Sequence, residues 1–439
     1  MKKTFLLSCL MLAAMPVMAA YTGRVYVDKN KNGVFDQSEK PLAGIKVSDG
    51  LNVVETAADG SFTLPGHERE RFIFITTPSG YKTFNRHYHK IEKKQSGYDF
   101  GLIPYSGRIR KDGSHRYIHI TDTEIFNTES HADWVNNVRD YARNEQAAFI
   151  IHTGDICYEK GLKAHIKLMN TENMDCPVFY CIGNHDLVKG KYGEELFESI
   201  YGPVYYSFDA GNVHYVVTPM PGGDHAPGYT SDDVCRWLKN DLAHIRPGTP
   251  VVVFNHDLLT YEDTFIFKSK NAGSINLNEY NLKAWVYGHW HINYMKKQGD
   301  VYSVCTSSLD KGGIDHSTTA FRVMHVDSKG DFTSELRYTY LDKNICIASP
   351  AGVMASGVLP VAVNVYSSVS PVREVLYTCL ADGKPVLKNK RLLQSTDWSW
   401  NGELPLSHKY VGKELTLRVT ARFNNGEIAK AESNFVCRT

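Results

Sequence analysis

The stretch Val-Phe-Tyr-Cys-Ile-Gly-Asn-His-Asp occupies residues 178–186 and decides the fold. Its apolar half, residues 178–181, has the length and β-type composition of a buried strand. Its polar half, Gly183-Asn184-His185-Asp186, then follows at the carboxyl end of that strand. Open α/β sheets place their ligand sites in loops at this end. We therefore expect a layered α/β domain around residues 178–186, with a functional loop at 183–186.

Four further segments repeat this arrangement of an apolar run followed by polar residues. The runs cover residues 117–120, 149–151, 251–254 and 284–287. The polar residues that follow them are Asp122 and Glu124, Asp155, His256, and His289 with His291. Amphipathic helices are predicted at 131–144, 193–200 and 231–244, between the strands. Because the strand ends share one edge of a sheet, these polar residues are predicted to meet there.

The polar set is chemically suited to metal ions. Carboxylate oxygens, imidazole nitrogens and an asparagine carbonyl suit divalent Mn, Fe or Zn, with Mg as a further candidate. His289 and His291 are separated by one residue, so they point to one side of an extended segment and can serve two neighbouring ions. Asp155 can bridge two ions. Two ions about 3.5–4 Å apart clamp the attacking and leaving oxygens of a displacement at phosphorus.

In this order, the motifs resemble those of the calcineurin-like metallophosphoesterase family. They are Gly154-Asp155, the 183–186 motif, the lone His256 and Gly288-His289-Trp290-His291. The resemblance implies a four-layer α/β/β/α domain and a dinuclear metal centre with a bridging hydroxide. It implies that one ion is held by Asp122, Asp155 and His291, and the other by Asp155, Asn184, His256 and His289. It also implies that His185 is the catalytic residue that protonates the leaving oxygen or stabilises the phosphoryl group.

Two positions depart from the family pattern. Glu124 occupies the place of a histidine; it can still bind metal, and its added negative charge favours Mn or Mg over Zn. A decaying site is the alternative interpretation. Tyr158 stands where protein phosphatases of this class have an aspartate that orients the catalytic histidine. The partner of His185 therefore stays open, and a protein phosphatase is disfavoured.

The regions on either side of the α/β segment have a different pattern. Residues 21–107 and 351–439 contain short β-type runs separated by Gly, Asn, Asp and Pro, which is typical of small β-sandwiches. We place the catalytic domain at 113–346 between them. Together the flanking regions resemble the β domains that accompany some exported bacterial members of the family.

Residues 28–39 match the spacing of a calcium-binding loop of the EF-hand type. Gly33 stands at position 6, and the predicted calcium ligands are Asp28, Asn30, Asn32, Val34 through its carbonyl, Asp36 and Glu39. No flanking helices are predicted. The alternative is an Asn- and Gly-rich turn without an ion.

Residues 1–20 have the pattern of a secretory signal peptide. Lys2 and Lys3 precede an apolar run over 5–17, and Val17 with Ala19 fits a cleavage site. We expect export to the periplasm or the extracellular space, with surface association left open. A buried N-terminal helix and a lipoprotein anchored at Cys9 are the alternatives. No later run reaches eighteen apolar residues, so no transmembrane segment is expected.

Charge and cysteine content limit the possible partners. The formal net charge is +1, so no global field favours nucleic acid, and no nucleic-acid-binding surface is expected. Eight cysteines follow the signal segment, without a zinc spacing. Most are expected to be buried free thiols, and Cys379 with Cys437 is the first pair to test for a disulfide.

The sequence supports two hypotheses of function. The first is a metal-dependent hydrolase of phosphate esters, acting on a phosphodiester or a small phosphomonoester, with a small or polymeric substrate. Lys311 and His225 are candidate substrate contacts, since Lys311 lies in a Gly-rich segment after the last motif and His225 in a Gly- and Pro-rich loop. The alternative is a calcium-stabilised surface or carbohydrate-binding protein whose phosphoesterase domain is inactive.

Overall fold

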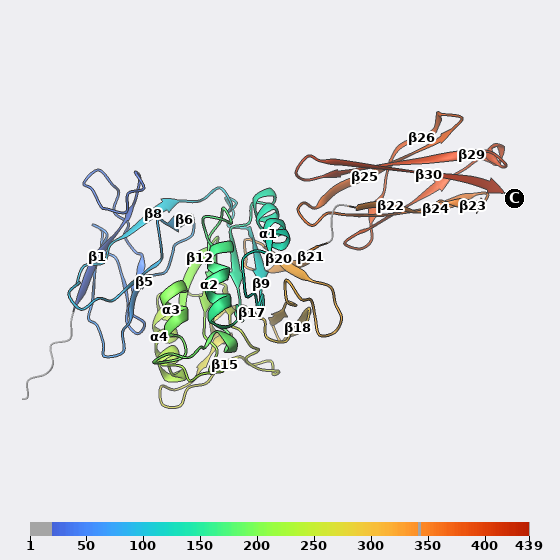
Figure 1. The fold of residues 1–439 in the computed structure, drawn as a ribbon. Coiled ribbons are helices and arrows are strands. Elements are labelled where there is room, and N and C mark those ends of the chain that lie inside the picture. Colours follow the sequence, from blue (N-terminus) through green and yellow to red (C-terminus); the bar gives the residue numbers. More distant parts are fainter. Residues whose placement is uncertain (1–19, 341–343, 439) are drawn as a thin grey trace, which may run out of the picture.

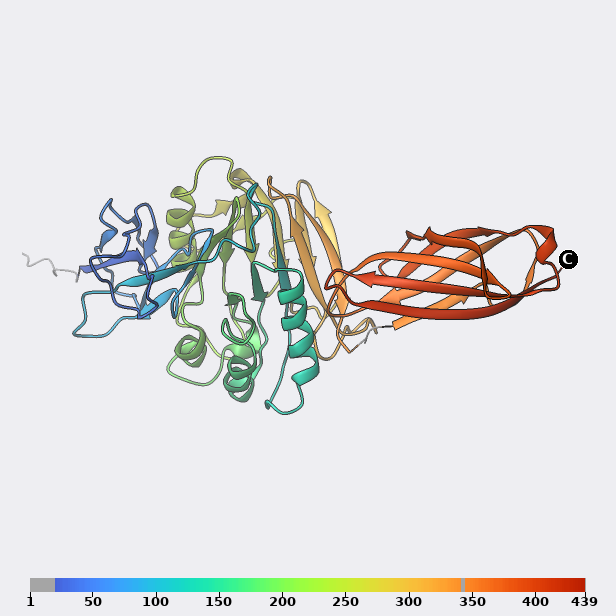
Figure 2. The ribbon, with the colours of Figure 1, turned by 90° about the horizontal axis from the view of Figure 1, so that it is seen from above.

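The computed structural model describes residues 20–340 and 344–438. The expected signal segment therefore lies, apart from its last residue, outside the described residues. An N-terminal β domain, a central α/β domain and a C-terminal β domain follow one another along the long dimension of the molecule (Figures 1 and 2). In the described ranges, none of the helices has the length and apolar character needed to cross a bilayer.

Two sheets form the centre of the α/β domain. The first contains, in spatial order, β11 (Val178–Tyr180), β10 (Phe149–His152), β9 (His115–Ile120), β20 (Ala320–Val326) and β21 (Phe332–Tyr338). The second contains β12 (Tyr206–Ala210), β13 (Val213–Val217), β14 (Val251–Phe254), β17 (Leu282–Tyr287), β19 (Val301–Cys305) and β18 (Tyr294–Gln298). A small hairpin is formed by β15 (Ile266–Phe267) and β16 (Ile275–Asn276). Parallel pairing of β9, β10 and β11, and of β13, β14, β17 and β19, aligns their carboxyl ends.

Aromatic side chains fill the space between the two sheets. Phe149 from the first sheet lies 4.9 Å from Tyr215 of the second, measured between ring centroids. The outer faces are covered by α1 (Ala132–Asn144), α2 (Tyr158–Leu168), α3 (Glu195–Tyr201) and α4 (Ser231–Ala243). Trp134 of α1 packs in the core of the first sheet, and Trp237 of α4 in that of the second. The expected α/β domain is confirmed; α2 adds a helix to those expected from the sequence.

The N-terminal domain consists of two short sheets around one apolar core. Their strands are β4 (Ser61–Leu64), β1 (Tyr21–Val27), β8 (Phe100–Pro104) and β6 (Tyr81–Thr83), and β3 (Val53–Glu55), β2 (Lys46–Ser48), β5 (Phe72–Ile75) and β7 (Tyr88–Lys90). The expected β-rich region before the catalytic domain is confirmed.

The C-terminal domain also has two sheets around one core. They contain β22 (Asn344–Ser349), β24 (Val358–Tyr366), β28 (Ser399–Pro405) and β27 (Leu393–Gln394), and β23 (Gly352–Ala355), β30 (Ile428–Arg438), β29 (Glu414–Phe423), β25 (Val372–Ala381) and β26 (Lys384–Arg391). Because β22 pairs with β24, residues 344–346 belong to this domain and not to the catalytic domain, in which we had placed them. Cys379 and Cys437 lie in the core as free thiols, and burial raises the pKa of Cys379 to about 11.

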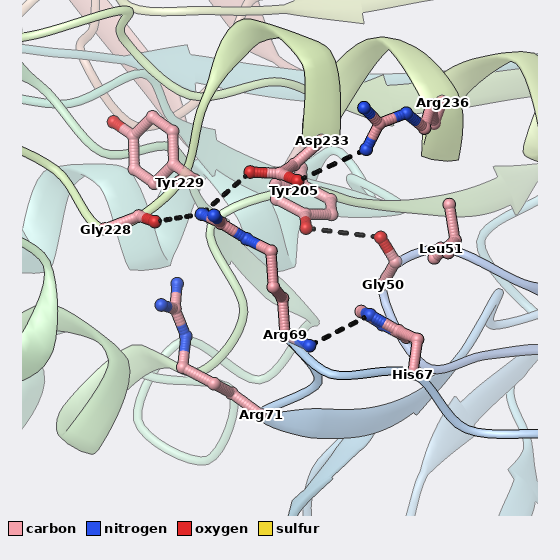
Figure 3. A pocket seen from close by; sticks show the side chains of 10 residues that line it. All are labelled: Gly50, Leu51, His67, Arg69, Arg71, Tyr205, Gly228, Tyr229, Asp233 and Arg236. Carbon is pink, nitrogen blue, oxygen red and sulfur yellow. Dashed lines mark hydrogen bonds and ion pairs between the residues drawn. The ribbon is translucent and has the colours of Figure 1, made fainter. Parts of the chain in front are cut away.

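Two arginines of the N-terminal domain, Arg69 and Arg71, contact the catalytic domain (Figure 3). The guanidinium of Arg69 donates to the carbonyl of Gly228 at 2.6 Å and pairs with Asp233 at 3.0 Å. Arg71 pairs with the buried carboxylates of Glu194 and Glu198, each at 2.8 Å. Glu194 also accepts a hydrogen bond from the Gly228 amide at 2.8 Å. The loop that ends at Gly228 is therefore anchored by residues of both domains.

Candidate metal centre

The predicted metal ligands gather at the carboxyl ends of β9, β10, β14 and β17 and in the loop after β11. One group contains Asp155, His256 and His289, and a second contains Asp122, Glu124 and His291. In each group, one ligand atom per residue lies within 4.8 Å of the others. Six of the seven predicted ligands are thus brought together in two adjoining groups, and the seventh, Asn184, is in the short helix η1 (Asn184–Asp186) of the 183–186 motif.

In the first group, Nε2 of His256 lies 3.1 Å from Oδ2 of Asp155. Nδ1 of His256 donates to the Thr153 carbonyl at 2.7 Å, which leaves Nε2 with a free lone pair for a cation in the neutral ring. Burial opposes a proton on His256, but the Asp155 carboxylate outweighs burial and raises the pKa of the ring to about 9. A positive charge is therefore favoured at this point.

The second group has the same character. Nε2 of His291 lies 3.2 Å from Oδ1 of Asp122 and 3.4 Å from Oε1 of Glu124. The close contacts with the carboxylates of Asp122 and Glu124 raise the pKa of His291 to about 10. Glu124 thus faces the same space as the other two ligands, although it stands in the place of a histidine. Lys311 forms an ion pair with Glu124 and brings a positive charge to the rim.

Buried polar atoms without hydrogen-bond partners show that the site fits metal ions. Among the described residues, twelve buried side-chain polar atoms lack a hydrogen-bond partner, and three of them lie at this site: Oδ1 of Asp122, Oδ1 of Asn184 and Nε2 of His256. An unsatisfied buried polar group costs about 1–3 kcal/mol. All three atoms belong to predicted metal ligands, so bound cations would remove the cost.

The backbone of the site is also strained. Asp122, Glu124, Asp155, His289 and His291 all have positive φ, between 46° and 66°. Residues other than Gly in this region cost about 1–3 kcal/mol each and cluster at functional sites. Five predicted ligands therefore adopt a backbone that stability alone disfavours.

Asp186 fixes the loops that carry the ligands. Its carboxylate accepts hydrogen bonds from the backbone amides of Asp155, Cys157 and Gly183, each at 2.9 Å. A Cβ at Gly183 would lie 2.3 Å from Oδ1 of Asp155, so glycine is required at this contact. Burial, together with the Asp155 charge, raises the pKa of Asp186 to about 7. Asp186 is thus a structural clamp between two motifs.

His185 has a carboxylate partner that the sequence did not reveal. Its Nδ1 lies 2.9 Å from Oδ2 of Asp224, and the Asp224 amide donates to the Asn184 carbonyl at 3.1 Å. The ring of Tyr158 lies 5.3 Å from the ring of His185. Burial lowers the pKa of His185, but the bond to Asp224 and nearby carboxylates outweigh burial, and the pKa is raised.

The predicted substrate contacts lie in different surroundings. Lys311 is at the rim of the second group. His225 is exposed, and the loop that carries it reaches the site through its neighbour Asp224. The Gly- and Pro-rich composition marked this loop in the sequence, but it did not show which of its side chains contacts His185.

In the predicted calcium loop, the carboxylates of the first and last residues accept hydrogen bonds from backbone amides of the loop itself. Asp28 accepts hydrogen bonds from the amides of Asn32 and Gly33, and Glu39 accepts from those of Lys29 and Asp36. Asp28 and Glu39 are buried, and among the described residues neither forms an ion pair with Lys or Arg. Calcium at this loop stays a prediction.

Comparison with known proteins identifies the family. Residues 115–293 match the model of the calcineurin-like phosphoesterases, and residues 29–104 match the model of the N-terminal domain of calcineurin-like phosphoesterases. The two matches span more than half of the chain. The chain therefore belongs to the calcineurin-like phosphoesterase family, a family of phosphoric ester hydrolases.

Individual relatives are more distant. The chain is 26% identical to purple acid phosphatase 13 of Arabidopsis thaliana over 215 residues, which are 46% of this chain and 36% of that protein. A solved archaeal phosphodiesterase is 12% identical and aligns with 50% of this chain and 99% of its own, with a TM-score of 0.26. A phosphoesterase-like protein of Streptococcus pneumoniae is 12% identical and aligns with 51% and 97%, with a TM-score of 0.24.

Proposed function

We propose that this protein is a metal-dependent hydrolase of phosphate esters that uses two divalent ions. The observation that carries the proposal is the pair of adjoining ligand groups, together with the unpaired buried atoms Oδ1 of Asp122, Oδ1 of Asn184 and Nε2 of His256. We propose Asp122, Glu124 and His291 as ligands of one ion, Asn184, His256 and His289 as ligands of the other, and Asp155 as the bridge. Mn, Fe, Zn and Mg are the candidates.

When bound, such ions supply Lewis acidity toward the phosphoryl oxygens and acidify a water molecule. The chain supplies the proton transfer. His185 stands beside the ligands, and its Nδ1 contacts Asp224, which leaves Nε2 to protonate the leaving oxygen. Asp224 is a positioning residue, because it holds the ring and favours its charged form. Lys311 is proposed to contact the substrate's phosphate from the rim.

The proposed substrate class is a phosphodiester or a small phosphomonoester, either small or polymeric. Bis-p-nitrophenyl phosphate and p-nitrophenyl phosphate distinguish the two when the purified protein is assayed with each candidate metal. Turnover of either supports the proposal. If neither substrate is hydrolysed with any of the metals, the alternative is favoured: a calcium-stabilised surface or carbohydrate-binding protein with an inactive phosphoesterase domain.

We also propose that the 28–39 loop binds calcium, because two buried carboxylates without cationic partners frame it. Calcium should raise the melting temperature of the wild-type protein but not that of Asp36→Ala. Export to the periplasm or the extracellular space is proposed from residues 1–20 alone. Fractionation of cells that express the full chain tests it, and retention in the cytoplasm would contradict it.

A further inference from the structure

An open cavity of about 480 Å³, whose lining residues are mainly aromatic and aliphatic, adjoins the first ligand group. His289 lines it together with Trp290, Tyr261, Ile292 and Ile314. Trp290 lies between the two ligand histidines in the sequence, so the cavity and the metal centre share one segment of backbone. A volume in this range suits a small organic group.

The exposed apolar side chains of this cavity are held in place. Tyr261 is 73% exposed, yet the buried amide of Gln298 donates to the carbonyls on both sides of it, at Thr260 and Glu262. Ile314 is 75% exposed, and its backbone amide donates to the His291 carbonyl at 2.9 Å. Fixed backbone beneath exposed apolar side chains is typical of a binding surface and not of a mobile loop.

The two aromatic rings of this cavity pack against each other. The rings of Tyr261 and Trp290 are stacked, with centroids 5.8 Å apart and planes at 27°. The indole nitrogen of Trp290 donates to Oδ1 of Asp257 at 3.0 Å, which sets the orientation of the ring. Tyr287 meets the indole edge to face at 5.2 Å and supports it from within the sheet.

We propose that this cavity is a substrate subsite that binds a flat aromatic ring esterified to the phosphate. The subsite rests on the proposed function, because His289 belongs both to the cavity lining and to the proposed metal centre. Stacked rings on one wall and isoleucines nearby favour a planar apolar group. A sugar would require several polar side chains, whereas five of the seven lining residues are aromatic or aliphatic, and Oδ1 of Asp257 accepts a hydrogen bond from the indole.

The subsite is tested by calorimetric titration of the Mn-loaded full chain with benzylphosphonate and methylphosphonate, which are not hydrolysed at phosphorus. We expect benzylphosphonate to bind about tenfold more tightly, as one stacked ring provides. Tyr261→Ala should remove most of this preference without changing the affinity for methylphosphonate or the metal content. Tyr261→Phe and the exposed control Leu393→Ala in the C-terminal domain should keep it.

Equal affinity of the two phosphonates, no binding of either, or an unchanged preference in Tyr261→Ala would overturn the subsite. Trp290→Ala is a weaker test because it can disturb both ligand histidines, so its metal content is measured in parallel. Turnover separates the two proposals. Preferential binding of benzylphosphonate without hydrolysis of any ester would refute the proposed function and leave a binding site for the aromatic ring alone. Hydrolysis of an ester without this preference would support the function and overturn the subsite.

Discussion

Nδ1 of His185 lies 2.9 Å from Oδ2 of Asp224, a residue in a loop 39 positions further along the chain. The contact orients the imidazole and supports its charged form. It replaces the aspartate for which this chain has Tyr158. The same loop ends at Gly228, which Arg69 and Glu194 hold between the N-terminal and catalytic domains. The proposed proton donor thus depends on a loop that both domains anchor.

Replacement of Asp224 should slow the reaction without removing the metals. We expect Asp224→Ala to lower kcat by about 10²-fold, the lower end of what positioned proton transfer contributes. Steady-state kinetics with metal analysis measure both quantities. In a His185→Ala background the same change should have almost no further effect, because Asp224 acts through that ring. Independent, additive losses would contradict this relationship.

Glu124 should influence the choice of metal. Glu124→His replaces a carboxylate with the imidazole usual in the family, so activity with Zn relative to Mn should rise by about tenfold. Activity titrations with each metal measure the ratio. Glu124→Asp is the matched control that keeps the charge and should keep the preference for Mn. An unchanged ratio in Glu124→His would show that this side chain does not bind metal.

Lys311 should contribute to binding of the anionic substrate. Lys311→Met keeps the aliphatic stem but removes the charge at the rim, and KM should rise by about tenfold with a smaller change in kcat. Lys311→Arg should restore most of the affinity. If Lys311→Met changes the metal content instead, the lysine serves only to neutralise Glu124.

The contact between the domains should depend on pH through Glu198. Burial and the neighbouring Glu194 raise the pKa of its carboxyl from the ordinary 4.5 to about 7, although Arg71 opposes the rise. The folded state therefore binds this proton more tightly, so its contribution to stability is present below pH 4.5 and is lost as the pH rises to 7. Glu198→Gln should flatten the decline of the urea midpoint across this interval. The same slope in both proteins would contradict the assignment.

The sequence predicted the residues whose roles follow from local order. Asp155, His256 and His289 each follow a strand directly in the chain. Because these strands run parallel within their sheets, their carboxyl ends bring the three side chains together, as expected. Their motifs also contain glycines at positions where a side chain would collide with a neighbouring ligand. A Cβ at Gly288, for example, would lie 2.5 Å from Oδ2 of Asp122.

Features that depend on long-range packing were not predictable from the sequence. Asp224 meets His185 only because a Gly- and Pro-rich loop folds back, and the neighbouring His225, which we had named, turns out to be exposed. The pairing of β22 with β24 likewise depends on tertiary contacts. Because of this pairing, the C-terminal domain includes residues 344–346, which we had assigned to the catalytic domain. The Arg71 contacts join parts of the chain more than one hundred residues apart.

Metal analysis of wild-type, His185→Ala and Asp155→Ala proteins, combined with turnover of the two p-nitrophenyl substrates, tests the central claim most directly. We predict two divalent ions per chain in the wild type and in His185→Ala, turnover reduced by about 10²–10⁴-fold in His185→Ala, and loss of both ions with activity in Asp155→Ala. Wild-type protein that binds no divalent metal, or Asp155→Ala protein that keeps two ions and full turnover, would contradict the dinuclear site.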